Sequence, residues 1–298
     1  MKKHSKLESN RLEIFAHIFL AVMCVIFVVP LIAAVIVSFS SQESIAKHGY
    51  QFIPESFSLE AYEVIFTTYG ASLFRSLGIT ITSGIIAPLL SIFLTMLIAY
   101  PLSQADFKGR DFWRIFVLIT MLFGGGLIPQ YVLRTKYLGL KNNIMVYLIP
   151  AIGGWNVFLF RTFFVNIDQA MIESAKIDGA NKLQILFRIM LPLTKSLVAI
   201  NFFTGFLGKW NDITTPLYYI TDQALYPIQY LLQRMITSVL EAKALFEEGM
   251  VGAEGLINLP VEPMRFAMAV IGALPVFILF PYLQKYYAKG IMLGSTKG

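Results

Sequence analysis

The chain has 298 residues, of which 56% are hydrophobic and 14% are charged, and its formal net charge is +6. A soluble domain is usually about 45–50% apolar and about 25% charged, so this composition excludes an ordinary water-soluble domain and indicates a membrane protein. The basic residues lie between apolar runs, which favours membrane topology over nucleic-acid binding as the reason for the positive charge. Cys24 is the only cysteine, so neither an internal disulfide nor a cysteine metal cluster is possible.

Six apolar runs are each long enough to cross a hydrocarbon core of about 30 Å, which predicts an all-α integral membrane protein with six transmembrane helices. The first run follows a basic head, but it is about twice as long as a signal-peptide core and lacks a cleavage site, so we expect an uncleaved helix. Gly84 and Pro88 are tolerated inside a bundle, and we interpret the three glycines at 124–126 as close-packing positions. The predicted spans are 14–39, 77–100, 115–133, 144–165, 197–220 and 266–282.

The distribution of lysine and arginine between the loops predicts that both termini are cytoplasmic. On this topology residues 166–196 form a cytoplasmic loop, and residues 40–76 and 221–265 form external loops. The second external loop contains an amphipathic stretch, Tyr230–Phe246, followed by an acidic turn region, Glu247–Gly255. It is either a simple connection between helices or a docking surface for an extracellular partner.

The cytoplasmic loop predicts a short helix–turn–helix. Asp168 or Asn166 is placed to cap a helix that carries Glu173 early, where a carboxylate suits the helix N-terminus. The triplet 178–180, Asp-Gly-Ala, then ends this helix, because glycine tolerates the backbone angles of a turn. A second amphipathic stretch follows, with an apolar side made of Leu183, Leu186, Phe187, Met190 and Leu191. Amphipathicity alone is also typical of an ordinary interfacial helix.

The same loop resembles the EAA loop of the membrane subunits of bacterial ABC importers, which reads E-A-A-x-x-D-G-A and, further on, I-x-L-P. The matching residues are Glu173, Ala175, Asp178, Gly179, Ala180, Ile189, Leu191 and Pro192. Three positions depart from the pattern: Ser174 replaces the alanine at its second position, Leu186 a common phenylalanine and Ser196 a common proline. The helix order, the FGGGLIP stretch at 123–129 and the tail at 289–298 resemble the smaller maltose-type permease partner of the carbohydrate-uptake branch, in its complex-oligosaccharide subgroup.

This resemblance implies the type I ABC importer permease fold, in the bacterial cytoplasmic membrane, with a coupling helix around Glu173–Ile185 seated in a cleft of an ATP-hydrolysing subunit. Glu173 would make the polar contact, Asp178 and Gly179 would set the turn, and Ser174, Ala175 and Ala180 complete the coupling residues. The implied partners are a second homologous permease subunit, two ATPase subunits and an extracellular solute-binding protein. The tail at 289–298 would lie at the ATPase dimer, unless it is a frayed terminus.

Catalytic motifs are absent from the sequence, which predicts that the chain is not an enzyme and needs no cofactor of its own. There is no G-x-x-x-x-G-K-[ST] phosphate loop, so we expect ATP and Mg to be bound by partner subunits. There is no H-E-x-x-H or G-x-S-x-G motif either, and the three histidines are scattered. No metal site is predicted.

Polar residues inside two predicted spans are candidates for the path of an oligosaccharide substrate, because polar groups in a membrane usually face a cavity or a partner. Asn211 and Asp212 would bond sugar hydroxyls and Trp210 would offer a stacking face, unless Lys209 and Asp212 form a purely structural ion pair. Trp155 and Asn156 form the second candidate pair. Asn156 would alternatively bond a neighbouring helix.

Three other readings compete with an oligosaccharide permease. The same ABC machinery would carry another solute, such as an amino acid or polyamine. An ion-coupled secondary transporter would show inverted repeats and broken helices at the midplane, and we see neither in the sequence. A membrane-embedded enzyme is disfavoured by the lack of a catalytic constellation.

Overall fold

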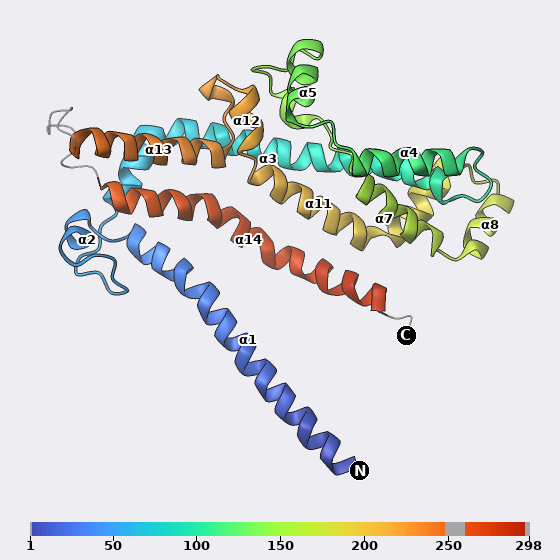
Figure 1. Cartoon of the computed structure of the whole chain (residues 1–298), viewed down its shortest axis with the longest axis horizontal. Coiled ribbons are helices and arrows are strands. Elements are labelled where there is room, and N and C mark those ends of the chain that lie inside the picture. The colour runs from blue at the N-terminus through green and yellow to red at the C-terminus, as the bar shows by residue number, and fades with distance from the viewer. Residues whose placement is uncertain (1, 248–259, 296–298) are drawn as a thin grey trace. The chain divides into compact units, whose positions relative to one another are not determined.

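The computed structural model describes residues 2–247 and 260–295, and within them the fold is helical, with one isolated bridge between Ser40 and Phe57 (Figure 1). The described residues fall into two compact units. The first unit contains the chain up to Ala71 together with Leu232–Leu274, and the second contains Ser72–Leu231 and the chain from Pro275 onward.

Three continuous helices are long and apolar enough to cross a membrane: α1 (Lys2–Ser38), α3 (Glu60–Ser103) and α14 (Val261–Ser295). The predicted spans that lie in them are 14–39, 77–100 and 266–282, although α1 ends one residue before its predicted boundary. The prolines inside these helices, Pro30, Pro88 and Pro275 among them, do not end them. Apolar surroundings favour intact helices because an exposed backbone group cannot bond water there.

The predicted span at 115–133 is broken in the middle. Helix α4 (Arg110–Leu122) is followed by α5 (Leu127–Val132) and the π-helix η1 (Leu133–Tyr137), and the direction changes by 105°. Gly126 has a φ of +75°, and a Cβ built on any of the three glycines at 124–126 meets no atom within 4 Å. The interpretation of these glycines as close-packing positions is therefore wrong, because they form the break itself.

The predicted spans 144–165 and 197–220 are also interrupted. The first contains α6 (Met145–Leu148) and α7 (Gly154–Val165), and the second contains most of α11 (Lys195–Trp210) and then α12 (Thr214–Tyr219). Helix α7 has 12 residues, which is about 18 Å and too short to span alone. Two pairs of helices, Arg110–Leu122 with Leu127–Tyr137 and Lys182–Leu193 with Lys195–Trp210, pass the same test together although each pair is bent. With each bent pair taken as one span, the described residues hold up to five, so the count of six stays a prediction.

The first unit joins the region before α3 to the start of α14. The Tyr62 hydroxyl lies 2.8 Å from that of Ser38, and its ring stacks on Phe39 at 4.9 Å. After α2 (Gln42–His48), the Tyr50 hydroxyl donates a hydrogen bond of 2.9 Å to Glu262, which raises the pKa of this tyrosine because the carboxylate favours the neutral phenol. The amphipathic stretch predicted at Tyr230–Phe246 lies in α13 (Ile228–Glu247). Most of the acidic turn region that follows lies outside the described residues.

Helices α3 and α11 approach each other closely in the second unit because glycine faces a bulky ring at two levels. A Cβ added to Gly205 would lie 2.9 Å from the Cβ of Pro88, and one added to Gly84 would lie 2.9 Å from Cδ2 of Phe206. Each helix therefore supplies one glycine and one ring to the same contact. This reciprocal arrangement fixes the spacing of the two helices.

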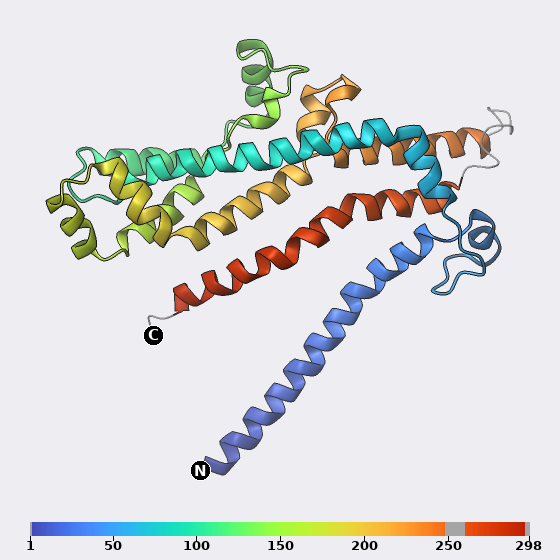
Figure 2. The same ribbon diagram turned by 180° about the vertical axis from the view of Figure 1, so that it is seen from behind.

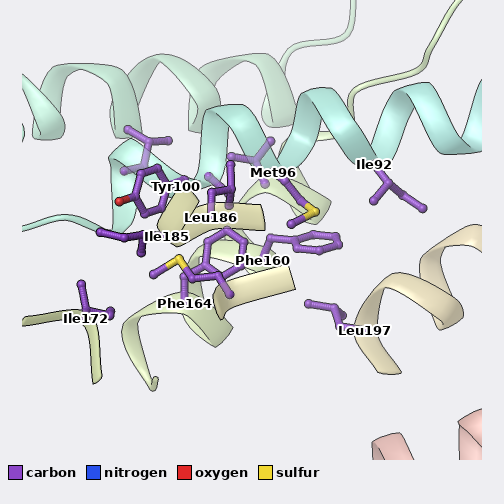
Figure 3. Close-up of a cluster of buried hydrophobic side chains, with 13 residues drawn as sticks. Ile92, Met96, Tyr100, Phe160, Phe164, Ile172, Ile185, Leu186 and Leu197 are labelled. Atoms are coloured by element: carbon purple, nitrogen blue, oxygen red, sulfur yellow. The ribbon is translucent and has the colours of Figure 1, made fainter. Parts of the chain in front are cut away.

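The main core of the second unit brings together α3, α7 and the segment that follows α9 (Lys182–Ile185). Figure 3 shows Met96 and Tyr100 of α3, Phe160 and Phe164 of α7, and Leu186 gathered in one cluster. All five side chains are buried, and interiors of this kind are packed as densely as organic crystals. The loop between α7 and α11 is thereby anchored to the helices.

Substitution of Gly205 by alanine should destabilise the protein because Pro88 is rigid and cannot move aside from the new Cβ. Overpacking of this kind costs about 1–3 kcal/mol. Gly208→Ala is the matched control, since its Cβ would meet nothing within 4 Å and alanine favours a helix. We expect a lower thermal unfolding midpoint in detergent for G205A alone. Equal midpoints for the two variants would contradict the close approach.

Candidate functional site

A cavity of about 550 Å³ lies between α3, α7 and α11 in the second unit. Its volume falls in the range of small-molecule sites, about 300–1,000 Å³. Its wall combines the Trp155 side chain, which is 65% exposed, with apolar groups such as Ile92 and Leu159. The polar side chains of the wall are Ser91, Thr95, Asn156, Asn201, Thr204, Lys209 and Asp212.

Helix α11 supplies one face of this wall through a stripe of polar and small residues. Thr204, Gly205 and Gly208 lie three, four and seven residues after Asn201, which is the spacing of one helix face, and Asp212 follows just after the end of α11. A Cβ on Gly208 would meet no atom of the described residues within 4 Å, so this glycine leaves space beside the polar residues, whereas Gly205 lies against Pro88. The stripe therefore keeps the cavity open on this side.

The two charged residues of the wall form a loose ion pair. The Lys209 ammonium lies 3.9 Å from Oδ2 of Asp212, which is longer than a hydrogen bond. Oδ1 of Asp212 accepts a 2.9 Å hydrogen bond from the backbone N–H of Thr215, so the start of α12 holds the carboxylate in place. Both side chains are mostly buried. The three ammonium donors are thus not committed to this carboxylate.

The structure brings together only part of the predicted substrate path. Trp155, Asn156 and Asp212 line the cavity. Trp210 does not, because its side chain is 1% exposed and stacks on Phe206 with ring centroids 5.8 Å apart. Asn211 is exposed outside the cavity, and its amide donates a 3.0 Å hydrogen bond to the Leu207 carbonyl.

Four polar residues of the wall were not predicted: Ser91, Thr95, Asn201 and Thr204. Three of them bond backbone carbonyls: Ser91 bonds Ala151 at 2.6 Å, Asn201 bonds Leu197 at 2.9 Å and Thr204 bonds Ile200 at 3.0 Å. The oxygen atom of each of these side chains can still accept a hydrogen bond from a ligand. The helical spacing of the polar residues along α11 was the feature of the sequence from which this face could have been predicted.

The opposite side of α11 borders an apolar groove of about 490 Å³. Phe203, Phe206 and Trp210 face Ile81 and Ile85 across it. Adjacent residues of α11, Phe203 and Thr204, therefore lie on different surfaces. Helix α11 separates a polar cavity from an apolar groove.

The turn of the EAA-like loop is a Schellman motif, which explains its sequence. Helix α8 (Gln169–Ile177) begins after Asp168, whose carboxylate accepts a hydrogen bond from Ala170, so the predicted cap is confirmed. The N–H of Ala180 bonds the Ala175 carbonyl and that of Gly179 bonds Lys176. Gly179 has a φ of +81°, the left-handed conformation this motif needs.

The alanines of the motif have a packing role in this cap. Ala175 and Ala180 are half-buried and pack against the main core. Glu173, Ser174 and Asp178 are exposed, so their polar groups face outward. Glu173 is the fifth residue of α8, beyond its first turn, and the predicted interaction of its carboxylate with the helix N-terminus is therefore wrong.

The second half of the loop begins with a capping box, in which Asn181 and Gln184 bond each other's backbone N–H groups. A π-helix, η2 (Leu186–Met190), then shifts the helical phase. Ile185 is consequently buried where Leu183 was predicted, and Leu183 is 58% exposed. Phe187 stacks on Phe93 of α3 at 6.0 Å.

The chain resembles curated carbohydrate transport proteins over nearly its whole length. It is 35% identical over 295 residues to the polygalacturonan/rhamnogalacturonan transport system permease protein YtcP of Bacillus subtilis, covering 97% of this chain and 99% of that protein. It belongs to the permease subunits of carbohydrate ABC transport systems. Protein LplC of Bacillus subtilis is 34% identical, covering 94% of this chain and 93% of LplC. No family model matches the chain.

A solved structure shares the fold of this permease. The crystal structure of a bacterial ABC transporter involved in the import of the acidic polysaccharide alginate contains a chain with a TM-score of 0.79 and 26% identity. The match covers 93% of this chain and 97% of that chain. The permease is accordingly an all-helical, multi-pass cell-membrane protein of the ABC importer type.

Cysteine labelling can test whether α11 separates the two surfaces. In a Cys24→Ser background, Thr204→Cys should react with a water-soluble maleimide because it opens on the cavity. Phe203→Cys is the matched control, since Phe203 is 4% exposed on the apolar groove. We expect labelling at 204 to be faster by about ten-fold or more, because the slow site must open first. Equal rates would contradict this arrangement.

Proposed function

We propose that this permease carries an oligosaccharide through the cavity between α3, α7 and α11, in an importer driven by separate ATPase subunits. The observation that carries the proposal is the cavity wall, which offers hydroxyl, amide and charged groups beside the exposed ring of Trp155. A sugar presents many hydroxyls that need partners and apolar faces that suit an aromatic ring. A polar group that is buried without a hydrogen-bond partner costs free energy, whether it belongs to the sugar or to the protein. The polar groups of this wall would supply those partners to a sugar.

The proposal assigns ATP coupling to the EAA-like loop. Glu173 and Asp178 are exposed on one side of the Schellman turn, while Ala175 and Ala180 hold its other side against the core. A partner that contacts the exposed side would thus push on a segment that is anchored to α3 and α7. This arrangement supports Glu173–Ile185 as the coupling helix.

The wider assembly also belongs to the proposal. The permease would cross the membrane six times with both termini cytoplasmic, beside a second homologous permease, two ATPase subunits and a solute-binding protein outside. ATP and Mg would be held by the ATPase subunits, and the tail at 289–298 would contact their dimer. The loop at 221–265 would face the binding protein.

We propose acidic oligosaccharides as the substrate class. Two similar proteins carry names or titles that refer to acidic polysaccharides, polygalacturonan and alginate. The loose pairing of Lys209 with Asp212 leaves ammonium donors for a sugar carboxylate.

Loss of the Glu173 carboxylate should uncouple ATP hydrolysis from the loaded binding protein. In the purified complex, we expect Glu173→Ala to lower substrate-stimulated ATPase activity by about ten-fold or more, the effect of one charge-assisted hydrogen bond. Gln169→Ala, an exposed polar residue of the same helix, is the matched control. Retained stimulation in E173A, with assembly intact, would overturn the coupling role.

Removal of the Lys209 charge should change substrate preference. We expect Lys209→Gln to reduce stimulation by oligogalacturonate-loaded binding protein about ten-fold, because a charged hydrogen bond to the carboxylate is lost. Stimulation by neutral galacto-oligosaccharides should be unaffected, and Lys209→Arg should retain the preference. Equal losses with acidic and neutral sugars would assign Lys209 to a structural pair with Asp212.

A further inference from the structure

Three arginine side chains meet at the carboxyl end of α3. This end is far along the helix from Pro88, where α3 contacts Gly205 of α11. Arg114 of α4 and Arg161 of α7 both donate to the Leu102 carbonyl, at 3.4 and 3.1 Å. Arg110 donates to the Gln104 carbonyl at 3.3 Å. Two guanidinium groups thus lie within hydrogen-bonding distance of one oxygen atom. We call Arg110, Arg114 and Arg161 the arginine cluster.

The arginine cluster carries more positive charge than its surroundings neutralise. Asp111 is the one carboxylate that pairs with it among the described residues, 2.9 Å from Arg114 and 3.8 Å from Arg110. The unsatisfied carbonyls at the end of α3 contribute about half a negative charge. An excess of more than one positive charge remains. Capping of α3 therefore accounts for the position of the cluster but leaves its charge uncompensated.

One donor of the cluster has no partner. Nε of Arg114 is buried and makes no hydrogen bond to any residue that the structure describes, although its neighbouring nitrogens bond Asp111 and Leu102. Buried nitrogens of this kind are nearly always bonded, so an unpaired one indicates a missing group. An anionic oxygen is the acceptor to which a guanidinium donates its strongest hydrogen bonds.

The surface beside the arginine cluster is apolar and aromatic. Phe112, Trp113 and Phe116 alternate with the arginines along α4 and touch one another edge to face. They are 46–65% exposed, and α4 has no buried residue. Exposed tryptophan beside arginine is typical of the boundary between hydrocarbon and headgroups.

We propose that the arginine cluster and the aromatic face of α4 form a binding site for the headgroup of an anionic phospholipid. The phosphate would lie among the three guanidinium groups, and the acyl chains would run along Phe112 and Phe116. Basic pockets between membrane helices bind anionic headgroups by this combination of charge and apolar surface. A bound lipid would bridge α4 and α7 at the end of α3. Nothing in this proposal depends on the transported solute.

The test compares lipid binding in the intact transport complex. The complex is placed in nanodiscs of phosphatidylcholine with increasing phosphatidylglycerol, and retained lipid is counted by native mass spectrometry. We expect Arg114→Gln to lower retention of phosphatidylglycerol about ten-fold or more, because charge-assisted hydrogen bonds are lost. Lys108→Gln removes the same charge from an exposed position next to the cluster and is the matched control, with a loss below about five-fold.

Two further arms keep the proposal testable if R114Q fails to fold. In the unmodified complex, phosphatidylglycerol should raise the thermal unfolding midpoint relative to phosphatidylcholine alone. Inorganic phosphate added to phosphatidylcholine nanodiscs should not reproduce this shift. Equal retention of the two lipids, or an equal shift with free phosphate, would overturn the lipid site. Loss of the partner permease from R114Q, with lipid retention unchanged, would overturn it in favour of a protein interface.

Discussion

The close approach of α3 and α11 is the constraint on which the second unit depends. Gly205 faces Pro88 and Gly84 faces Phe206, so neither helix can move along or around the other without a collision. Pro88 and Gly205 also belong to the cavity wall, while Phe206 belongs to the apolar groove. One contact therefore sets the boundary between the polar and apolar surfaces of α11. The ribbon in Figure 2 shows α11 running beside α3. The polar face of the helix borders open space at Gly208, where an added Cβ would meet no atom of the described residues within 4 Å.

The cavity and the EAA-like loop share residues through the main core. Ile92 of α3 and Phe160 of α7 line the cavity and also belong to the cluster that contains Ile185, Leu186 and Met190. A densely packed cluster transmits displacement, because its members cannot shift independently. Movement of the loop would consequently reach the cavity wall through direct contacts. This continuity is the physical basis for coupling in the proposed mechanism.

Local chemistry explains what the sequence could predict and what it could not. The turn at Gly179 was predictable because a Schellman motif depends on residues within one turn of each other. The break at 124–126 was misread, since glycine is equally suited to close packing and to an open turn, and only the neighbours decide. Leu183 was misplaced because a π-helix changes the helical phase, which a period of 3.6 residues does not anticipate.

The candidate site was partly predictable for a similar reason. Asn156 and Asp212 were found because polar groups in an apolar span are conspicuous, whereas Thr204 was missed because a hydroxyl that bonds its own helix is common in membranes. Trp210 looked like a sugar-stacking ring, but one position along α11 rotates a side chain by about 100°. That rotation places it beside Phe206 in the groove. Whether a side chain of α11 faces the cavity or the groove depends on where α3 packs, and no local sequence pattern specifies that.

Positively charged side chains lie beside apolar surroundings at two places, and their charge is balanced differently at each. Within the cavity, Lys209 has Asp212 from the same helix region, because a charge enclosed by protein must be paired nearby. At the end of α3, Asp111 is the one carboxylate in the described part of the chain that pairs with the arginine cluster, and the excess charge lies beside an exposed aromatic surface. Such an excess is tolerable only where the surroundings supply the counter-charge. The headgroup layer of a membrane supplies fixed phosphates, so the proposed lipid site would provide the counter-charge that the arginine cluster needs.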